Sequence, residues 1–101
     1  MDLVREIQTA VRTGKVAMGF RESLKAIVNG RAKLVLIASN APSEIRRDVA
    51  KYCKVSGTPL LEFPGTSWDL GAACGKPFMV SVLTILDPGE SGILDLAKGE
   101  A

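Results

Sequence analysis

Residues 69–89, DLGAACGKPFMVSVLTILDPG, contain in direct succession a short capped helix, a loop and an apolar strand. The loop is formed by Gly75, Lys76, Pro77 and Phe78. Gly75 is suited to end a helix and to bring the backbone close to a partner, Lys76 supplies a positive charge, and Phe78 offers a flat apolar face. A cation beside an exposed ring suits an unstacked base next to a phosphate. The same residues also fit a plain helix C-cap followed by a core phenylalanine, so the loop alone leaves both interpretations open.

Helices and strands alternate in the apolar pattern of the chain. Helices are expected from the first residues to Thr13, between Gly19 and Asn29, from an opening at residues 40–42 to Ser56, and over residues 67–74. Strands are expected at residues 16–18, 34–38, 60–63 and 79–86, followed by a turn at 87–90 and a brief apolar tail at Ile93 and Leu94.

The strand at residues 34–38, LVLIA, is apolar on both faces, which is typical of a strand inside a sheet that helices cover on both sides. Pro59 precedes the strand at residues 60–63, where a missing amide donor suits the edge of a sheet. The order of the elements predicts an α/β fold, a three-layer α/β/α sandwich with a mixed four-stranded sheet. Residues 1–101 are expected to form a single domain.

The helix at residues 67–74 has a well-marked start. Thr66 and Asp69 have the spacing of a capping box, which places Trp68 in the first helical turn. We therefore expect Trp68 to pack against the sheet or to cover part of this helix, in preference to stacking on a base.

Composition limits the size and the setting of the protein. A chain of 101 residues with 47% apolar content can bury one modest core. No uninterrupted apolar run is long enough to cross a membrane, and the first residues lack the pattern of a signal peptide, so we expect a cytoplasmic protein without a membrane partner. Cys53 and Cys74 are far apart and lie on apolar faces of predicted helices, which indicates reduced core thiols.

Several kinds of chemistry have no support in the sequence. The chain contains no histidine, which removes the commonest general base and the commonest metal ligand. With two distant cysteines and no carboxylate cluster at helical spacing, we expect no metal site. The glycines around Gly19 and Gly75 match neither a dinucleotide-binding fingerprint nor a phosphate loop. We therefore predict no catalytic residues, no cofactor and no small-molecule substrate.

The charges are distributed unevenly although the net charge is only +2. Residues 1–33 carry an excess of cations, and residues 58–101 carry an excess of carboxylates. A basic face for a polyanion is one interpretation, and ordinary solvated helix faces are the other. The charge pattern does not decide between them.

Three turns are expected to converge at one end of the sheet, around Gly19, Asn40 and Gly75. At the first turn a glycine ends a strand just before a helix, so backbone amides and the positive end of the helix dipole face outward, as in many anion sites. Arg21 and Lys25 share one helix face beyond it. Glu22 could accept from a base edge, cap the helix or pair with Lys25, while Asn40 suits a helix entry and could also reach a ribose or base edge.

Two blocks of sequence carry a family resemblance. The first comprises Gly19-Phe20-Arg21, Leu24-Lys25, Gly30, Lys33 and the strand and turn at residues 34–40. The second comprises residues 69–72, Gly75-Lys76, Leu83, Ile85, Asp87 and Gly89. By these residues the chain resembles, nearly end to end, the archaeal and eukaryotic large-subunit ribosomal protein family called "thirty-e", within the superfamily that binds kink-turn RNA.

The resemblance implies a structural constituent of the large ribosomal subunit whose loop end docks on a kink-turn or purine-rich internal loop of ribosomal RNA. It implies no catalysis and no cofactor, and we expect a monomer off the ribosome. Splayed, unpaired bases are what side chains read best in RNA. The implied RNA-binding residues are Gly19, Phe20, Arg21, Glu22, Lys25, Asn40, Ala41, Gly75, Lys76, Pro77 and Phe78, with Phe78 as the apolar contact to an extruded base.

Two positions depart from the family pattern. Val28 stands where the family usually has a basic residue, which puts one phosphate contact in doubt. Glu22 at an RNA-facing position is more typical of the wider superfamily, and a carboxylate near phosphates costs affinity unless it makes a specific hydrogen bond.

Two other functions remain open at this point. One is a guide-RNA particle protein of the same superfamily. The other is a small α/β ligand-binding protein or enzyme, for which Asp87, Glu90 and Ser91 are the only clustered polar residues.

Overall fold

The structure, a computed structural model, describes residues 2–99. Met1, Glu100 and Ala101, which the predicted domain of residues 1–101 includes, lie outside the described residues. The elements in chain order are α1 Leu3–Thr13, β1 Lys15–Met18, α2 Phe20–Val28, β2 Leu34–Ala38, α3 Ser43–Ser56, β3 Leu60–Phe63, α4 Ser67–Ala73, β4 Val82–Asp87 and α5 Ile93–Gly99.

The four strands form one mixed sheet in the order β1-β4-β2-β3. β4 runs antiparallel to both of its neighbours, pairing Leu83 with Met18 of β1 and with Leu36 of β2. β3 runs parallel to β2 at the sheet edge, as the position of Pro59 predicts. Because β1 and β2 both run against β4, their carboxyl ends lie at the same end of the sheet, where β4 begins.

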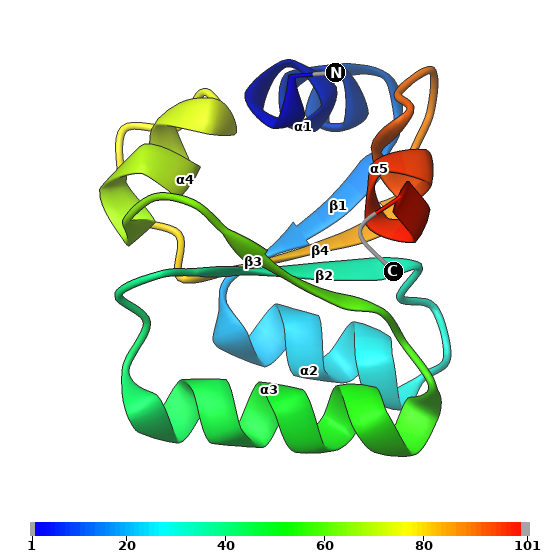
Figure 1. The fold of residues 1–101 in the computed structure, drawn as a ribbon, viewed down its shortest axis with the longest axis vertical. Helices are drawn as coiled ribbons and strands as arrows, with labels where there is room; N and C mark the ends of the chain where they lie inside the picture. Colours follow the sequence, from blue (N-terminus) through cyan, green and yellow to red (C-terminus); the bar gives the residue numbers. More distant parts are fainter. Residues whose placement is uncertain (1, 100–101) are drawn as a thin grey trace.

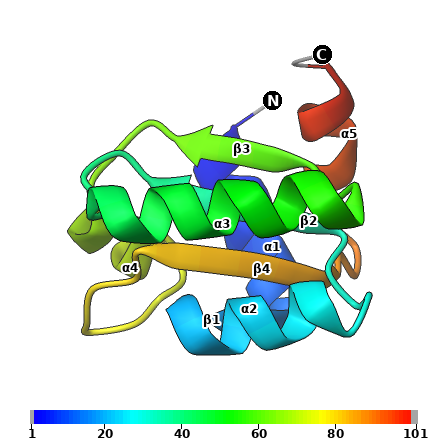
Figure 2. The ribbon, with the colours of Figure 1, turned by 90° about the horizontal axis from the view of Figure 1, so that it is seen from below.

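Helices cover both faces of the sheet, with α1, α4 and α5 on one side and α2 and α3 on the other (Figure 1). Figure 2 shows α2 and α3 lying side by side across their face of the sheet. The predicted three-layer α/β/α sandwich with a mixed four-stranded sheet is confirmed. None of the helices within residues 2–99 has the length and apolar character needed to cross a membrane.

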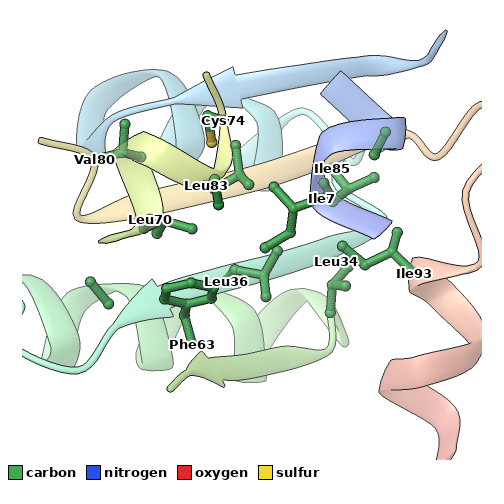
Figure 3. Close-up of a cluster of buried hydrophobic side chains, with 13 residues drawn as sticks. Ile7, Leu34, Leu36, Phe63, Leu70, Cys74, Val80, Leu83, Ile85 and Ile93 are labelled. Atoms are coloured by element: carbon green, nitrogen blue, oxygen red, sulfur yellow. The ribbon is translucent and has the colours of Figure 1, made fainter. Parts of the chain in front are cut away.

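Strand β2 supplies side chains to two separate cores, because successive residues of a strand point to opposite faces. Leu34 and Leu36 pack on the side of α1, α4 and α5, in the cluster of Figure 3 that also holds Ile7, Leu70 and Leu83. Val35 and Ile37 face α2 and α3. All five residues of β2 are buried, which is why its sequence is apolar throughout.

The ends of α4 follow directly from local sequence. Thr66 and Asp69 form the predicted capping box, in which each side chain accepts from the backbone amide of the other residue. At the other end Gly75 adopts a left-handed conformation with φ of 75°, and its amide donates to Ala72. The Lys76 amide donates to the carbonyl of Gly71, which completes a Schellman motif.

Two predicted elements differ in the structure. The last strand begins at Val82 and not at residue 79, because the Val80 amide donates to the carbonyl of Ser67 in α4, 3.0 Å away, and not to a neighbouring strand. The brief apolar tail at Ile93 is the start of a helix, α5. Its buried Ile93 belongs to the core, and the Gly92 amide before it donates to the Glu6 carboxylate at 2.6 Å.

The two cysteines are free and buried, as the sequence predicts. Burial raises the pKa of both thiols, and the Cys74 thiol reaches about 11 although nearby Lys76 acts in the opposite direction. Because the pKa of Cys74 is raised in the folded state, its protonated thiol contributes fully to stability when the pH is below 9.0, the ordinary pKa of this group. That contribution is lost as the pH rises from there toward 11.

We predict that iodoacetamide alkylates Cys74 slowly in the native protein. Near pH 9 an ordinary thiol is about half ionised, whereas Cys74 is about one-hundredth ionised. The alkylation rate of Cys74 in the native protein should therefore be at least roughly 50-fold lower than in the unfolded protein. Mass spectrometry of each cysteine-containing peptide, with the guanidinium-unfolded protein as control, measures the two rates. Equal rates in native and unfolded protein would contradict the buried placement.

Candidate functional site

The three predicted turns meet at one end of the sheet, at the left of Figure 1. Where β1 ends, the Gly19 amide donates to Val82, 2.9 Å away. Where β2 ends, the Ala38 amide donates to Ser81 over the same distance. Both strand ends are therefore hydrogen-bonded to Ser81 and Val82, the two residues that connect the loop at 75–80 to β4. The expected convergence is confirmed, and we call this surface the loop end.

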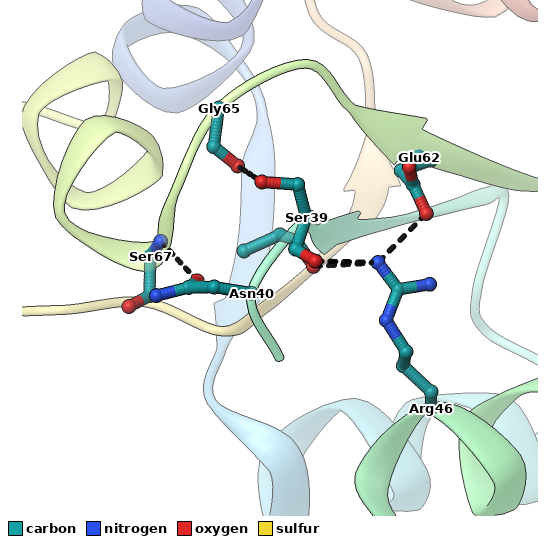
Figure 4. A network of polar contacts seen from close by, with 7 residues as sticks. Ser39, Asn40, Arg46, Glu62, Gly65 and Ser67 are labelled. Atoms are coloured by element: carbon teal, nitrogen blue, oxygen red, sulfur yellow. Dashed lines mark hydrogen bonds and ion pairs between the residues drawn. The ribbon is translucent and has the colours of Figure 1, made fainter. Parts of the chain in front are cut away.

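Ser67, in the first turn of α4, links two of these turns. Its amide donates to the Oδ1 atom of Asn40 at 2.8 Å, drawn in Figure 4, and its carbonyl accepts from the Val80 amide. Asn40 thus does not cap the following helix, whose N-cap residue is Pro42, and the helix-entry role expected for its side chain is wrong. The bond to Ser67 fixes the amide orientation, so the exposed NH₂ group of Asn40 is left to donate elsewhere.

Arg46 of α3 holds the end of β2 in place (Figure 4). Its Nη2 atom donates to the carbonyl oxygens of Ala38 and Ser39, at 3.2 and 3.0 Å, and pairs with the Glu62 carboxylate at 2.7 Å. Ser39 is held further by two hydrogen bonds to the Gly65 carbonyl, from its amide at 2.8 Å and its hydroxyl at 2.7 Å. The backbone that carries Asn40 is therefore fixed from two sides.

The loop from Gly75 to Phe78 packs closely on α4. A Cβ atom at Gly71 would collide with the carbonyl oxygen of Phe78, so only glycine allows this approach. The four loop residues themselves are exposed, and the Phe78 side chain retains 50% of its accessible surface. Phe78 is consequently not the core phenylalanine of the simpler interpretation.

Helix α2 presents charged side chains to solvent. Arg21, Glu22 and Lys25 are all exposed. The carboxylate of Glu22 lies 3.8 Å from the Lys25 ammonium, one helical turn away. This is the helix-surface pair that the spacing allows, and an exposed pair of this kind contributes little stability.

Two of the candidate residues use their side chains for packing. Ala41 is only 7% exposed and belongs to the core beneath α2 and α3, and its amide donates to Ala38. Phe20 is partly buried against the same core. The structure therefore turns these two inward and leaves Gly19 partly exposed. The candidates with exposed side chains are Arg21, Glu22, Lys25, Asn40, Lys76, Pro77 and Phe78.

Both long helices that begin at the loop end lack a side-chain cap. Gly19, with φ of 97°, precedes α2, and Pro42 precedes α3, and neither provides a side-chain hydrogen bond to the first helical amides. By contrast Asp2 caps α1 and Thr66 caps α4. The first amides and the positive dipole ends of α2 and α3 thus remain available to an anion at the loop end.

Trp68 lies on the surface, so the first of its two expected placements, against the sheet, is wrong, while the second, over part of α4, stays a prediction. Its side chain is 62% exposed, because the inward positions of α4 are filled by Leu70 and Ala73. Met79, 55% exposed, precedes the residue that bonds to Ser67. The sequence analysis identified neither residue as a surface candidate. The only signal, which concerns Trp68, was that a helix as short as α4 has few inward positions.

The polar cluster at Asp87, Glu90 and Ser91 lies at the opposite end of β4. The Asp87 carboxylate accepts from the Gly89 amide, and the Ser91 hydroxyl donates to the Pro88 carbonyl. The Glu90 amide donates to the Thr13 hydroxyl. The first two bonds are those of a tight turn, and the third joins that turn to the end of α1. Within residues 2–99, no group of three or more potential ligand side chains is placed to hold a metal ion.

Comparisons with known proteins identify the family of this chain. A model of the Ribosomal protein L7Ae/L30e/S12e/Gadd45 family matches residues 1–95. A protein named Large ribosomal subunit protein eL30 from Pyrobaculum calidifontis is 46% identical over 98 residues, which covers 97% of each chain. A relative of the same name from Methanosphaera stadtmanae is 45% identical, and the match covers 97% of this chain and 100% of the relative. Another from Saccharolobus solfataricus is 41% identical, and the match covers 92% of this chain and 86% of the relative.

A solved structure shares the fold. It is titled as a protein with unknown function from Bacillus halodurans C and matches with a TM-score of 0.84 and 25% identity over 95% of each chain.

The fold and the loops gathered at one end of its sheet make this protein an open α/β/α sandwich with a loop-end surface. The chain belongs to the Ribosomal protein L7Ae/L30e/S12e/Gadd45 family, and the predicted family resemblance is confirmed. The family and the curated relatives point to a structural ribosomal protein and not to an enzyme.

We predict that Arg46→Met destabilises the protein by about 1–2 kcal/mol, because two carbonyl oxygens and a carboxylate lose their partner. The matched control is Arg47→Met on the same helix, which removes the same charge from an exposed residue that forms no ion pair within the described chain. Urea unfolding measures both. Equal effects of the two substitutions would show that the Arg46 contacts do not hold the turn.

Proposed function

We propose that this chain is a non-catalytic constituent of the large ribosomal subunit in the cytoplasm, and that its loop end binds a kink-turn or purine-rich internal loop of ribosomal RNA. The ribosomal part is supported by family membership and by relatives named as large-subunit proteins. The same names favour the ribosome over a guide-RNA particle. We also propose that the protein is a monomer off the ribosome.

One observation carries the RNA part of the proposal, namely that two uncapped helix N-termini begin at the same end of the sheet. Backbone amides at such ends bind phosphate oxygens. Arg21, Lys25 and Lys76 add exposed cations at or beside the same turns. A phosphate backbone that bends sharply brings several anions close together, which matches a compact group of donors better than an extended one.

The remaining candidates suit unpaired bases. Phe78 presents half of its surface beside Lys76, so a base can stack on the ring while its phosphate meets the ammonium group. The NH₂ group of Asn40, oriented by Ser67, can donate to an acceptor on a base or ribose. Ala41 and Phe20 support this surface from below. Glu22 remains paired with Lys25 unless a base edge displaces it.

The direct test is a titration of the protein with a kink-turn RNA and with a control RNA whose sheared G·A pairs are replaced by Watson–Crick pairs. We expect strong preference for the kinked RNA at low and at moderate salt, because the site is shaped for splayed bases. Equal, salt-sensitive binding to both RNAs would reduce the protein to a general polyanion binder, and binding to neither would refute the proposed function.

Substitutions separate the two kinds of contact. Arg21→Ala and Lys25→Ala should weaken binding and each reduce the salt slope by about one, since each removes a phosphate contact. Phe78→Ala should weaken binding about 5- to 100-fold with an unchanged slope. Lys54→Ala, in the last turn of α3 at the opposite end of the sheet, serves as the charge control. Equal slopes for all four variants would contradict this division.

A further inference from the structure

Trp68 is an exposed aromatic residue that none of the contacts above uses. It is the only tryptophan of the chain, and 62% of its side chain is accessible. Tryptophan carries the largest apolar surface of any side chain and is seldom left in water when a core position is open to it. Its exposure here results from a helix whose buried positions, Ser67 and Leu70 among them, belong to other residues.

The backbone beneath Trp68 is held firmly. The capping box of Thr66 and Asp69 fixes the first turn of α4, and Leu70 anchors that turn in the core with no exposed surface. Ser67, immediately before Trp68, bonds to Asn40 on one side and to Val80 on the other. An aromatic ring on a rigid turn loses little conformational freedom when it binds a flat partner.

The backbone that carries Trp68 adjoins the proposed RNA surface. The bond between Ser67 and Val80 brings the first turn of α4 alongside residues 78–80, where Phe78 and Met79 are also exposed. Asn40 reaches the same turn from β2. The loop end therefore carries two exposed aromatic residues on adjoining segments, with Lys76 on the loop between them in sequence.

We propose that Trp68 is a stacking platform for a second unpaired base of the bound RNA, beside the base that stacks on Phe78. This inference rests on the proposed function. Stacking on an indole is tolerant of base identity, because every base has a π-face. Trp68 thus adds affinity for RNA with two splayed bases, whereas Asn40 adds hydrogen-bonding specificity.

The size of the patch favours a base over a protein partner. Phe78, Met79 and Trp68 keep 50%, 55% and 62% of their surface exposed, so at about 250 Å² or less each they supply no more than about 420 Å² together. A stable protein interface needs roughly 800 Å² from each partner. A single base needs only one ring face, and cationic side chains beside the patch favour a charged polymer.

The fluorescence of the single tryptophan provides the test. The protein is titrated with the kink-turn RNA while binding is measured independently by filter retention. We expect Trp68 emission to be quenched in parallel with retention, and acrylamide to reach the bound indole less than the free one. RNA retention with unchanged emission and unchanged acrylamide access would overturn the stacking role and leave the proposed function intact. Absence of retention would instead count against both.

Variants give the affinity side of the same test. Trp68→Ala should bind the kink-turn RNA about 5- to 100-fold more weakly with an unchanged salt slope, and Trp68→Phe should recover most of the loss. Because Trp68 is exposed, both variants should keep the circular dichroism and the urea midpoint of the parent. Val55→Ala removes an apolar side chain that is 81% exposed near the far end of α3 and should leave affinity unchanged. Equal affinity of Trp68→Ala and the parent protein would refute the inference.

Discussion

The arrangement of this protein depends on the position of β4 between β1 and β2. Since β4 pairs antiparallel with both, the carbonyls of Val82 at its start and of Ser81 just before it accept from the amides of Gly19 and Ala38, at the ends of its two neighbours. Two strand-to-helix turns and the loop that leads from α4 are thereby brought together at that end, where β3 also ends and leads into α4. Strands adjacent in space but distant in sequence thus create a surface that no local segment could form.

The polar contacts at this surface serve mainly to fix backbone. Arg46 binds the carbonyls at the end of β2, and Ser67 uses its amide and its carbonyl to join Asn40 to the segment before β4. These bonds do not involve the exposed cations, the NH₂ group of Asn40 or the exposed aromatic rings, which lie on the backbone that the bonds fix. Such preorganisation matters for RNA binding, because side chains that are already in place lose less freedom on association.

Much of the fold could be predicted from the sequence, because its signals are local. The apolar run of β2, the capping box at Thr66 and the glycine that ends α4 each depend on a few neighbouring residues. The start of β4 could not be predicted, since it follows from one bond between Ser67 and Val80. The exposure of Trp68 could not be predicted either, since it follows from the filling of the inward positions of α4 by other residues. The role of Asn40 was missed for the same reason: its partner is twenty-seven residues away.

The most direct measurement of the central claim is amide hydrogen exchange of the free protein and of its complex with a kink-turn RNA. If the loop end is the binding surface, protection should appear in the first turns of α2 and α3 and across residues 66–80, because these amides become hydrogen-bonded or covered. The opposite end, at residues 29–33 and 87–92, should exchange as before. Protection at that opposite end, or no change at the loop end upon binding, would contradict the account.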